Sequence, residues 1–232
     1  GQSFSDLDSL KKAAALKAVE FVRDGMVVGL GTGSAATSFI KALGAKVRAG
    51  LAVRGLPTSE VSAKLATELG IPLVSFDDVP HLDVCVDGAD EIDPRGDLIK
   101  GYGGALVREK IVAAFAKRFV ILAGFEKRVK VLGERGKLPV EVVSFALTPC
   151  RRALEKMGFA AELREKDGEA FVTDNGNYIL DCRTAAIPDP AETDARMLAV
   201  PGVVGTGIFA KMAHTIMVQN EDHSVEVREV SE

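Results

Sequence analysis

The chain has 232 residues, 47% of them hydrophobic and 27% charged, with a formal net charge of −4. This length suffices for one large domain or for one domain with an insertion. The slight acidity and the lack of a Lys/Arg run argue against nucleic acid as a partner. No apolar run approaches eighteen residues and the start of the chain lacks a signal-peptide pattern, so we expect no membrane partner.

The cysteines and histidines carry little sign of metal or disulfide chemistry. Cys85, Cys150 and Cys182 are odd in number, widely spaced and free of any C-x-x-C pattern. We therefore expect buried thiols in a reducing, cytoplasmic environment. The three histidines are not at metal-ligand spacing, so we expect no zinc site.

Apolar periodicity predicts alternating helices and strands up to residue 123. In chain order, we expect a helix within 5–25, a strand over 26–30, a turn and helix within 31–44, a strand over 50–53, a helix over 59–69, strands over 73–76 and 82–86, a helix within 105–117 and a strand over 119–123. Such alternation is typical of a parallel sheet with helices on both faces, and it predicts a Rossmann-like domain.

The pattern changes to β-α-β-β-α-β after residue 127, which predicts a ferredoxin-like α+β domain inserted into the first. We expect strands over 138–145, 161–165, 171–173, 178–183 and 203–209, and helices over 149–157 and 191–198. A strand over 215–219 then returns to the main sheet, followed by an acidic tail. The predicted domains are 1–132 with 212–232, and 133–211.

The turn after the first strand, GTGS from Gly31 to Ser34, is a candidate phosphate site. A Gly-x-Gly turn that enters a helix presents backbone N–H groups and hydroxyls to an anion. A dinucleotide fingerprint fits poorly, because the G-x-G-x-x-G spacing is missing and no acidic residue follows about twenty residues later. A plain helix cap remains the alternative.

A second candidate follows the strand over 82–86, where DGADEID is succeeded by KGYGGALVREK. Carboxylates directly after a buried strand lie at the carboxyl end of the sheet, where open α/β folds bind ligands. Each piece alone has an ordinary explanation as a solvated turn or a glycine cap. Together they supply what proton transfer at carbon requires, namely a carboxylate base, a cation for the oxygen and a closely approaching backbone.

These motifs together resemble one family, ribose-5-phosphate isomerase type A. The resemblance rests on GLGTGS at 29–34, TSEVSAKLA at 58–66, DGADEID at 87–93, KGYGGALVREKI at 100–111 and the region from Glu126 to LPVEV. It implies an aldose–ketose isomerisation of D-ribose 5-phosphate and D-ribulose 5-phosphate through an enediolate, in the non-oxidative branch of the pentose phosphate pathway. It also implies that no metal or organic cofactor takes part.

The resemblance implies a role for four catalytic residues. Glu109 matches the base that moves the proton between C2 and C1, and Lys100 matches the lysine that stabilises the enediolate oxygen. Asp87 matches the carboxyl group that handles protons on the sugar oxygens, and Asp90 matches its neighbour, which assists ring opening. Substrate-binding positions carried over in the same way are Thr32, Gly33, Ser34, Ala35, Gly88, Ala89, Gly101, Tyr102, Gly103 and Lys127.

Two residues depart from the family pattern, and both belong to the presumed binding loops. Ala35 stands where many members carry Thr, which puts one substrate hydrogen bond in doubt. Tyr102 stands where many carry Gly, which could alter the width of the pocket. Members of the family commonly form homodimers or homotetramers, so the resemblance also implies a homo-oligomer.

Two other functions must be weighed. A sugar-phosphate deaminase or a CoA-transferase-like protein could share the α/β fold, but a deaminase is expected to use a catalytic His, and none lies beside these motifs. A non-catalytic sugar-phosphate sensor would have little need of Glu109, and no helix pair for DNA binding is attached.

Overall fold

The structure is a computed structural model that describes the backbone of residues 4–230 and the side chains from Lys12 onward. The chain divides into two compact units, Gly1–Ala89, Arg108–Lys127 and Met212–Glu232 in the first and Asp90–Val107 and Arg128–Lys211 in the second. Residues 90–107 and 128–132, which we had placed in the Rossmann-like domain, thus belong to the second unit. The domain boundaries themselves stay a prediction.

The first unit is built on a six-stranded sheet in the order β15-β14-β6-β3-β1-β2, parallel except for β15. Without the antiparallel edge strand, this is a doubly wound arrangement whose strand order reverses between β1 and β3. Ligands of such sheets bind at the carboxyl ends of the strands where the order reverses. The strands are β1 (Val27–Leu30), β2 (Arg54–Pro57), β3 (Leu82–Asp87), β6 (Ala116–Gly124), β14 (Thr215–Gln219) and β15 (Val225–Glu229).

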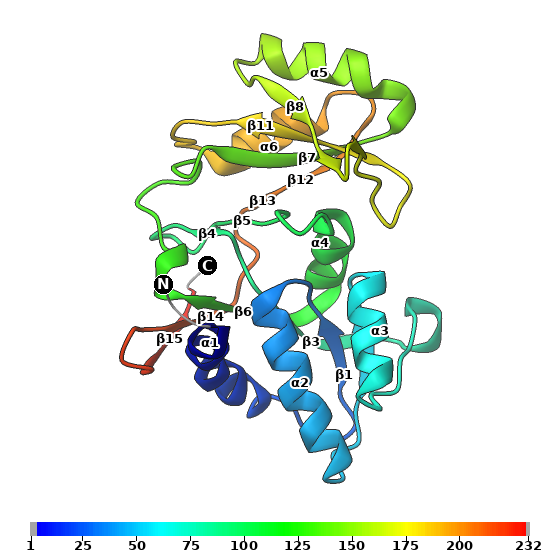
Figure 1. Ribbon diagram of the computed structural model, residues 1–232, viewed down its shortest axis with the longest axis vertical. Coiled ribbons are helices and arrows are strands. Elements are labelled where there is room, and N and C mark those ends of the chain that lie inside the picture. Colours follow the sequence, from blue (N-terminus) through cyan, green and yellow to red (C-terminus); the bar gives the residue numbers. More distant parts are fainter. Residues whose placement is uncertain (1–3, 231–232) are drawn as a thin grey trace. The chain divides into compact units, whose positions relative to one another are not determined.

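Helices cover both faces of this sheet. On one face, Leu30 of β1 and Val86 of β3 share a buried core with Phe39 of α2 (Ser34–Arg48) and with α1 (Phe4–Val19). The side chains next to them along each strand point to the opposite face of the sheet. The helices α1 and α2 lie side by side (Figure 1). On the other face, Gly29 leaves room for Val112 of α4 (Leu106–Phe115). A further helix, α3 (Glu60–Glu68), follows β2.

The second unit contains a four-stranded antiparallel sheet in the order β12-β7-β11-β8. Its elements are β7 (Lys137–Val142), α5 (Leu147–Lys156), β8 (Ala161–Leu163), β11 (Tyr178–Arg183), α6 (Pro190–Leu198) and β12 (Val203–Thr206). This is the β-α-β-β-α-β series of a ferredoxin-like layer. The predicted fold class, a Rossmann-like sheet with a ferredoxin-like insertion, is confirmed.

Short strands and single 3₁₀ turns complete the two units. In the second unit, a three-stranded sheet runs in the order β13-β5-β4 and a two-stranded hairpin joins β9 to β10. Their bounds, with those of the 3₁₀ turns, are β4 (Glu91–Ile92), β5 (Leu98–Ile99), β13 (Ile208–Phe209), β9 (Glu165–Lys166), β10 (Glu169–Ala170), η1 (Phe76–Asp78), η2 (Phe125–Lys127) and η3 (Ser144–Ala146).

Three predicted strands are wrong. The strand expected over 50–53 begins only at Arg54, because Gly50 has φ +113° and Ala52 donates its N–H to Asp24 in a loop. In the strand expected over 73–76, only Leu73 forms a β-bridge, because Ser75 and Asp78 form a capping box around η1. Residues 171–173 are not a strand, and the acidic tail, for which no element was predicted, contains β15.

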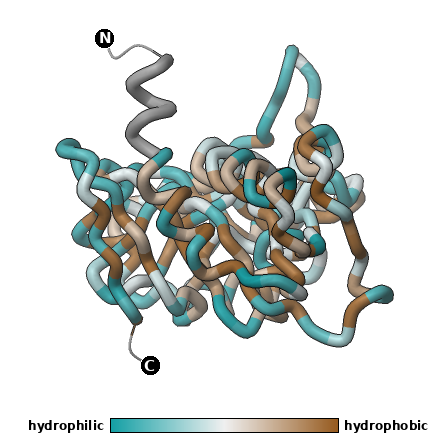
Figure 2. The backbone as a smooth tube through the Cα atoms, turned by 90° about the horizontal axis from the view of Figure 1, so that it is seen from below, coloured by the Kyte–Doolittle hydropathy of each residue, from teal (hydrophilic) through white to brown (hydrophobic). Residues whose placement is uncertain are grey.

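Hydropathy follows this architecture. Hydrophobic residues gather in inner segments of the backbone, whereas many of the projecting loops are hydrophilic (Figure 2). Among the residues that the structure describes, none of the helices is long and apolar enough to cross a membrane.

Candidate active site

The carboxyl ends of β1 and β3 meet at the point where the strand order reverses, and Asp87 lies there fully buried. Asp87 Oδ1 accepts the N–H of Gly88 at 2.7 Å and that of Thr32 at 3.2 Å. A Cβ on Gly31 would overlap the carboxyl group of Asp87. Gly31 is therefore required for space, and the turn after β1 is built around the Asp87 carboxylate.

Four hydroxyl groups form a cluster at the same edge of the sheet. The Oγ1 of Thr32 lies 2.8 Å from that of Thr58 and donates to Ser59 Oγ at 2.8 Å, and Ser59 Oγ lies 2.7 Å from Ser62 Oγ. Ser59 is also the N-cap of α3 and accepts the N–H of Ser62. This hydroxyl cluster, Thr32, Thr58, Ser59 and Ser62, ties the turn after β1 to the start of α3.

Each hydroxyl proton of the cluster is used in a hydrogen bond, either to another hydroxyl of the cluster or to a backbone carbonyl. Thr58 donates to the carbonyl of Leu30 and Ser62 donates to that of Gly31, so Ser59 must donate to Ser62. The Thr32 hydroxyl therefore supports the turn rather than donating to a ligand. Gly33, the N-cap of α2, and Ser34, its first residue, are exposed at the start of this helix.

Ser62→Ala is expected to weaken both folding and substrate binding. The buried Gly31 carbonyl loses its hydroxyl donor, which should lower the free energy of unfolding by about 1–3 kcal/mol. Because the turn after β1 loosens, KM for the sugar phosphate implied by the sequence resemblance should rise. Urea unfolding and steady-state kinetics measure the two effects, with Thr67→Ala on the exposed side of α3 as the control. Equal behaviour of the two variants would contradict a supporting role for the cluster.

Glu109 is buried in the first turn of α4. A helix that connects parallel strands begins at their carboxyl ends. Val112 packs against Gly29, where a Cβ would lie 2.7 Å from Val112 Cγ1. Glu109 is one turn earlier on the same helix face, about 4.5 Å nearer the carboxyl edge. Helix geometry therefore puts Glu109 on the sheet-facing side of α4, nearer the carboxyl edge than Val112.

The remaining predicted residues of the first unit lie around the same edge. A Cβ on Gly88 would lie 3.3 Å from the Ala35 Cβ, so the first turn of α2 passes close to the residue after Asp87. Ala89, the last residue of the segment Gly1–Ala89, is half-buried. Lys127 is half-buried in η2, directly after β6, the neighbour of β3.

In the second unit, the residues Lys100 to Gly103 follow β5 and are called the lysine loop below. Asp90 makes hydrogen bonds to β5 and to this loop. The Asp90 N–H donates to Ile99 O at 2.8 Å, and its Oδ2 accepts the Tyr102 N–H at 3.0 Å. Lys100 is 2% exposed, donates its N–H to Gly207 O, and holds Nζ 5.6 Å from the centre of the Phe209 ring. Asp90 is thus joined by hydrogen bonds to β5 and to the loop of Lys100, Gly101, Tyr102 and Gly103.

The Tyr102 ring packs on β7. The hydroxyl donates to the Lys137 carbonyl at 3.2 Å, and the Lys137 Nζ lies 4.4 Å from the ring centre. Burial, together with Glu91 and Asp90, raises the pKa of Tyr102 to about 12, so the phenol stays protonated. The departure from Gly at this position is therefore accommodated within the second unit.

The other two acids of DGADEID are structural. Glu91 accepts the N–H groups of Gly133 and Arg135, and Asp93 accepts those of Arg95 and Asp97. Both carboxyl groups are buried, and burial raises the pKa of each. Their carboxylates hold turns of the second unit.

The raised pKa of Glu91 predicts a pH-dependent stability. The native state binds the proton more tightly than the unfolded chain, so the stabilisation is complete below the ordinary value of 4.5 and is lost as pH rises through the native pKa. Glu91→Gln removes this titration. The free energy of unfolding of wild type minus that of the variant should therefore fall as pH rises above 4.5. Urea titrations at several pH values test this, and a pH-independent difference would contradict it.

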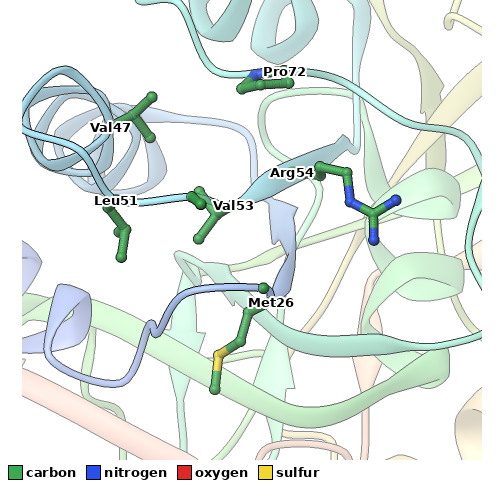
Figure 3. Close-up of a pocket in the computed structure, with 8 residues that line it drawn as sticks. Met26, Val47, Leu51, Val53, Arg54 and Pro72 are labelled. Atoms are coloured by element: carbon green, nitrogen blue, oxygen red, sulfur yellow. The ribbon is translucent and has the colours of Figure 1, made fainter.

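A separate hollow of about 330 Å³ lies at the amino ends of β1 and β2 (Figure 3). None of the predicted site residues lines it. Apolar side chains surround it, and Arg54 extends away from Val47 and Leu51. Its lining is Gly25, Met26, Val47, Leu51, Ala52, Val53, Arg54 and Pro72. Without a carboxylate, this hollow is unsuited to proton transfer.

The structure brings the predicted residues together as two groups. Asp87, Glu109 and the turn from Thr32 to Ala35 gather in the first unit, and Asp90 and Lys100 gather in the second. The sequence did not lead us to the residues that hold the turn after β1 in place. Thr58, Ser59 and Ser62 are all present in the motif TSEVS, whose three hydroxyls could have suggested the cluster. No group of three His, Cys, Asp or Glu side chains placed to hold a metal occurs within the described residues.

Comparison with known proteins agrees with this geometry. The family profile for ribose 5-phosphate isomerase A (phosphoriboisomerase A) matches residues 54–223. The chain is 51% identical over 220 residues to ribose-5-phosphate isomerase A of Roseiflexus sp. (strain RS-1), with 94% of each chain covered.

Solved structures extend the likeness to nearly the whole chain. Ribose 5-phosphate isomerase A from Methanocaldococcus jannaschii is 41% identical with a TM-score of 0.91, over 97% of this chain and 99% of that one. A D-ribose-5-phosphate isomerase in complex with phospho-erythronic acid is 39% identical with a TM-score of 0.91, over 96% and 98%. The chain therefore belongs to the ribose-5-phosphate isomerase A family, whose members interconvert ribose 5-phosphate and ribulose 5-phosphate.

Proposed function

We propose that this chain carries out the family's reaction through an enediolate, with Glu109 moving the proton between C2 and C1 of the open-chain sugar. Asp87 handles the protons of the sugar oxygens, and Asp90 assists ring opening. Lys100 stabilises the oxygen that becomes negative. The observation that supports this proposal is the burial of Asp87 at the carboxyl end of β3, where the strand order reverses, and of Glu109 one helical turn before Val112, which packs against Gly29 of β1.

The chemistry explains why these residue types are required. A C–H next to a carbonyl is a weak acid, so the barrier falls mainly when the oxyanion formed by proton loss is stabilised. A buried ammonium serves this purpose, because a charge interacts more strongly in a site that excludes water. A positioned carboxylate then removes the proton, which contributes about 10²–10⁴-fold to the rate.

The phosphate group does not react, and its binding serves to position the sugar. We assign it to the start of α2, where Gly33 and Ser34 are exposed and the helix presents N–H groups. Half-buried Lys127 adds a positive charge at the end of β6. Binding energy from this remote group can hold the chain open and aligned with the base.

A proton-exchange experiment in heavy water tests the reaction class directly. Ribose 5-phosphate incubated with the enzyme in heavy water should gain deuterium at the exchanging carbon, and ribulose 5-phosphate should accumulate. A deaminase or a non-catalytic sensor would give neither result. Turnover without exchange would favour direct hydride transfer and would reject Glu109 as a base that exchanges its proton with solvent.

Phospho-erythronic acid, the ligand of one related structure, provides a binding probe. Its carboxylate places negative charge on oxygen next to the carbon chain, as an enediolate does. We propose that it binds this chain as a mimic of the enediolate, with its carboxylate in the place of the sugar oxygen that becomes negative.

Assembly and location belong to the same proposal. We propose a homodimer or homotetramer, with no nucleic acid or membrane partner and no metal or organic cofactor. The three cysteines are buried free thiols, which supports a reducing cytoplasmic location.

A further inference from the structure

Arg164 is anchored in the second unit by its backbone and by a carboxylate. It follows β8, donates its N–H to Ile179 O at 2.9 Å, and accepts the N–H of Phe171 at 2.8 Å. Its Nε donates to Asp181 Oδ2 at 2.9 Å and its Nη2 donates to Oδ1 at 2.7 Å. Both side chains are largely buried, at 12% and 16% exposure. This bidentate pair fixes the plane of the guanidinium.

The third nitrogen of the same guanidinium reaches the lysine loop. Arg164 Nη1 donates to the carbonyl of Gly101 at 3.1 Å and to that of Tyr102 at 3.0 Å. The Phe171 ring lies 5.8 Å from the guanidinium carbon and also fills the space beside Gly104. Two successive peptide groups of the loop are thus held by one side chain.

The peptide between Tyr102 and Gly103 is the part of this loop most able to turn over. Gly104 donates its N–H to Gly101 O, so residues 101–104 form a β-turn with this peptide at its centre. Gly103 keeps a negative φ, as a type I turn requires. Glycine tolerates positive φ equally well, which would allow a type II turn with the central peptide reversed. The bond from Arg164 to Tyr102 O opposes that reversal.

Peptide planarity sets the direction of the donor groups. Because N–H and C=O of a trans peptide point opposite ways, carbonyls turned toward Arg164 direct the Tyr102 and Gly103 N–H groups away from it. The Tyr102 N–H is used by Asp90. The Gly103 N–H has no hydrogen-bond acceptor among the described residues, and Gly103 is exposed.

We propose that Arg164, held by Asp181, is a positioning residue that keeps the Gly103 N–H directed at the substrate as a donor to the sugar oxygen that becomes negative. This inference rests on the proposed function, because it takes the Lys100 loop as part of the substrate site. Arg164 itself touches no substrate. Its effect passes through the orientation of one peptide group.

The test compares Arg164→Lys with Arg183→Lys. Arg183 lies on the neighbouring strand and pairs with Glu162 at 3.0 Å, but both side chains are exposed. Lysine keeps the charge of Arg164 and loses the fork that reaches the aspartate and the carbonyls together. Arg164→Lys should lower kcat about 10- to 100-fold, as expected for one lost hydrogen bond to a developing charge. Arg183→Lys should leave kcat unchanged.

Binding measurements separate positioning from general damage. Arg164→Lys should lower the affinity for phospho-erythronic acid by the same factor by which it lowers kcat/KM. Its affinity for inorganic phosphate should equal that of the wild type. Asp181→Asn keeps Arg164 but holds its side chain less firmly. It should therefore also weaken the binding of phospho-erythronic acid and leave that of inorganic phosphate unchanged, with a smaller loss than in Arg164→Lys. Unchanged kcat in Arg164→Lys would overturn the proposal, as would equal losses for both ligands or normal kcat in Asp181→Asn. If wild type itself failed to isomerise ribose 5-phosphate, the proposed function would fail first.

Discussion

Glu109→Gln is expected to lower kcat for ribose 5-phosphate by about 10²–10⁴-fold, the contribution of a positioned general base. Glutamine has nearly the shape of glutamate, so the first turn of α4 and the contact between Val112 and Gly29 should persist. The amide has no basic oxygen able to accept a proton from carbon. Steady-state kinetics should show the loss in kcat, and deuterium exchange in heavy water should fall by the same factor.

Binding and a matched control decide what the loss means. Phospho-erythronic acid should still bind Glu109→Gln, because the α2 start and Lys100 are unchanged. Glu68→Gln, an exposed position on α3, makes the same chemical change away from the site and should leave kcat intact. Normal turnover by Glu109→Gln would reject Glu109 as the base, and lost analogue binding would show a structural role.

Sequence periodicity located the long elements, because each of them buries one face. The strands over 82–87 and 215–219 and the helix over 190–198 lie where their apolar patterns indicate. Two-residue strands such as β4 and β5 are too short to show any period. The strand expected over 50–53 failed for a different reason, since the apolar residues there belong to a loop held by Asp24.

The proposed functional residues could be predicted from the sequence more fully than the residues that hold them in place. Asp87 is recognisable because a carboxylate directly follows an apolar strand, which places it at the carboxyl edge of the sheet. Nothing local separates Asp90 from Glu91, since the two are adjacent acids. Only the structure shows that Glu91 holds the N–H groups of a turn some forty residues away. Arg164 lies far from the lysine loop in sequence, so its contact with Tyr102 O could not be predicted.

Lys100→Met should reduce kcat by about 10²–10³-fold, as the loss of a donor to a developing oxyanion does. Lys100 is buried and its ammonium lies against the Phe209 ring, a position that an unbranched apolar side chain can fill. KM should change less than kcat, because the negative charge on the sugar oxygen exists only after proton removal.

Lys137→Met makes the same substitution at another lysine of the second unit whose ammonium lies over an aromatic ring, that of Tyr102. It should keep kcat near wild type, since Lys137 has no assigned role in the reaction. Lys100→Arg should remain impaired despite its charge, because the planar guanidinium cannot take the place of a compact ammonium in a buried site. A Lys100→Met enzyme that changed only in KM would make this lysine a binding residue, and stabilisation of the oxyanion would then fall to the Gly103 N–H.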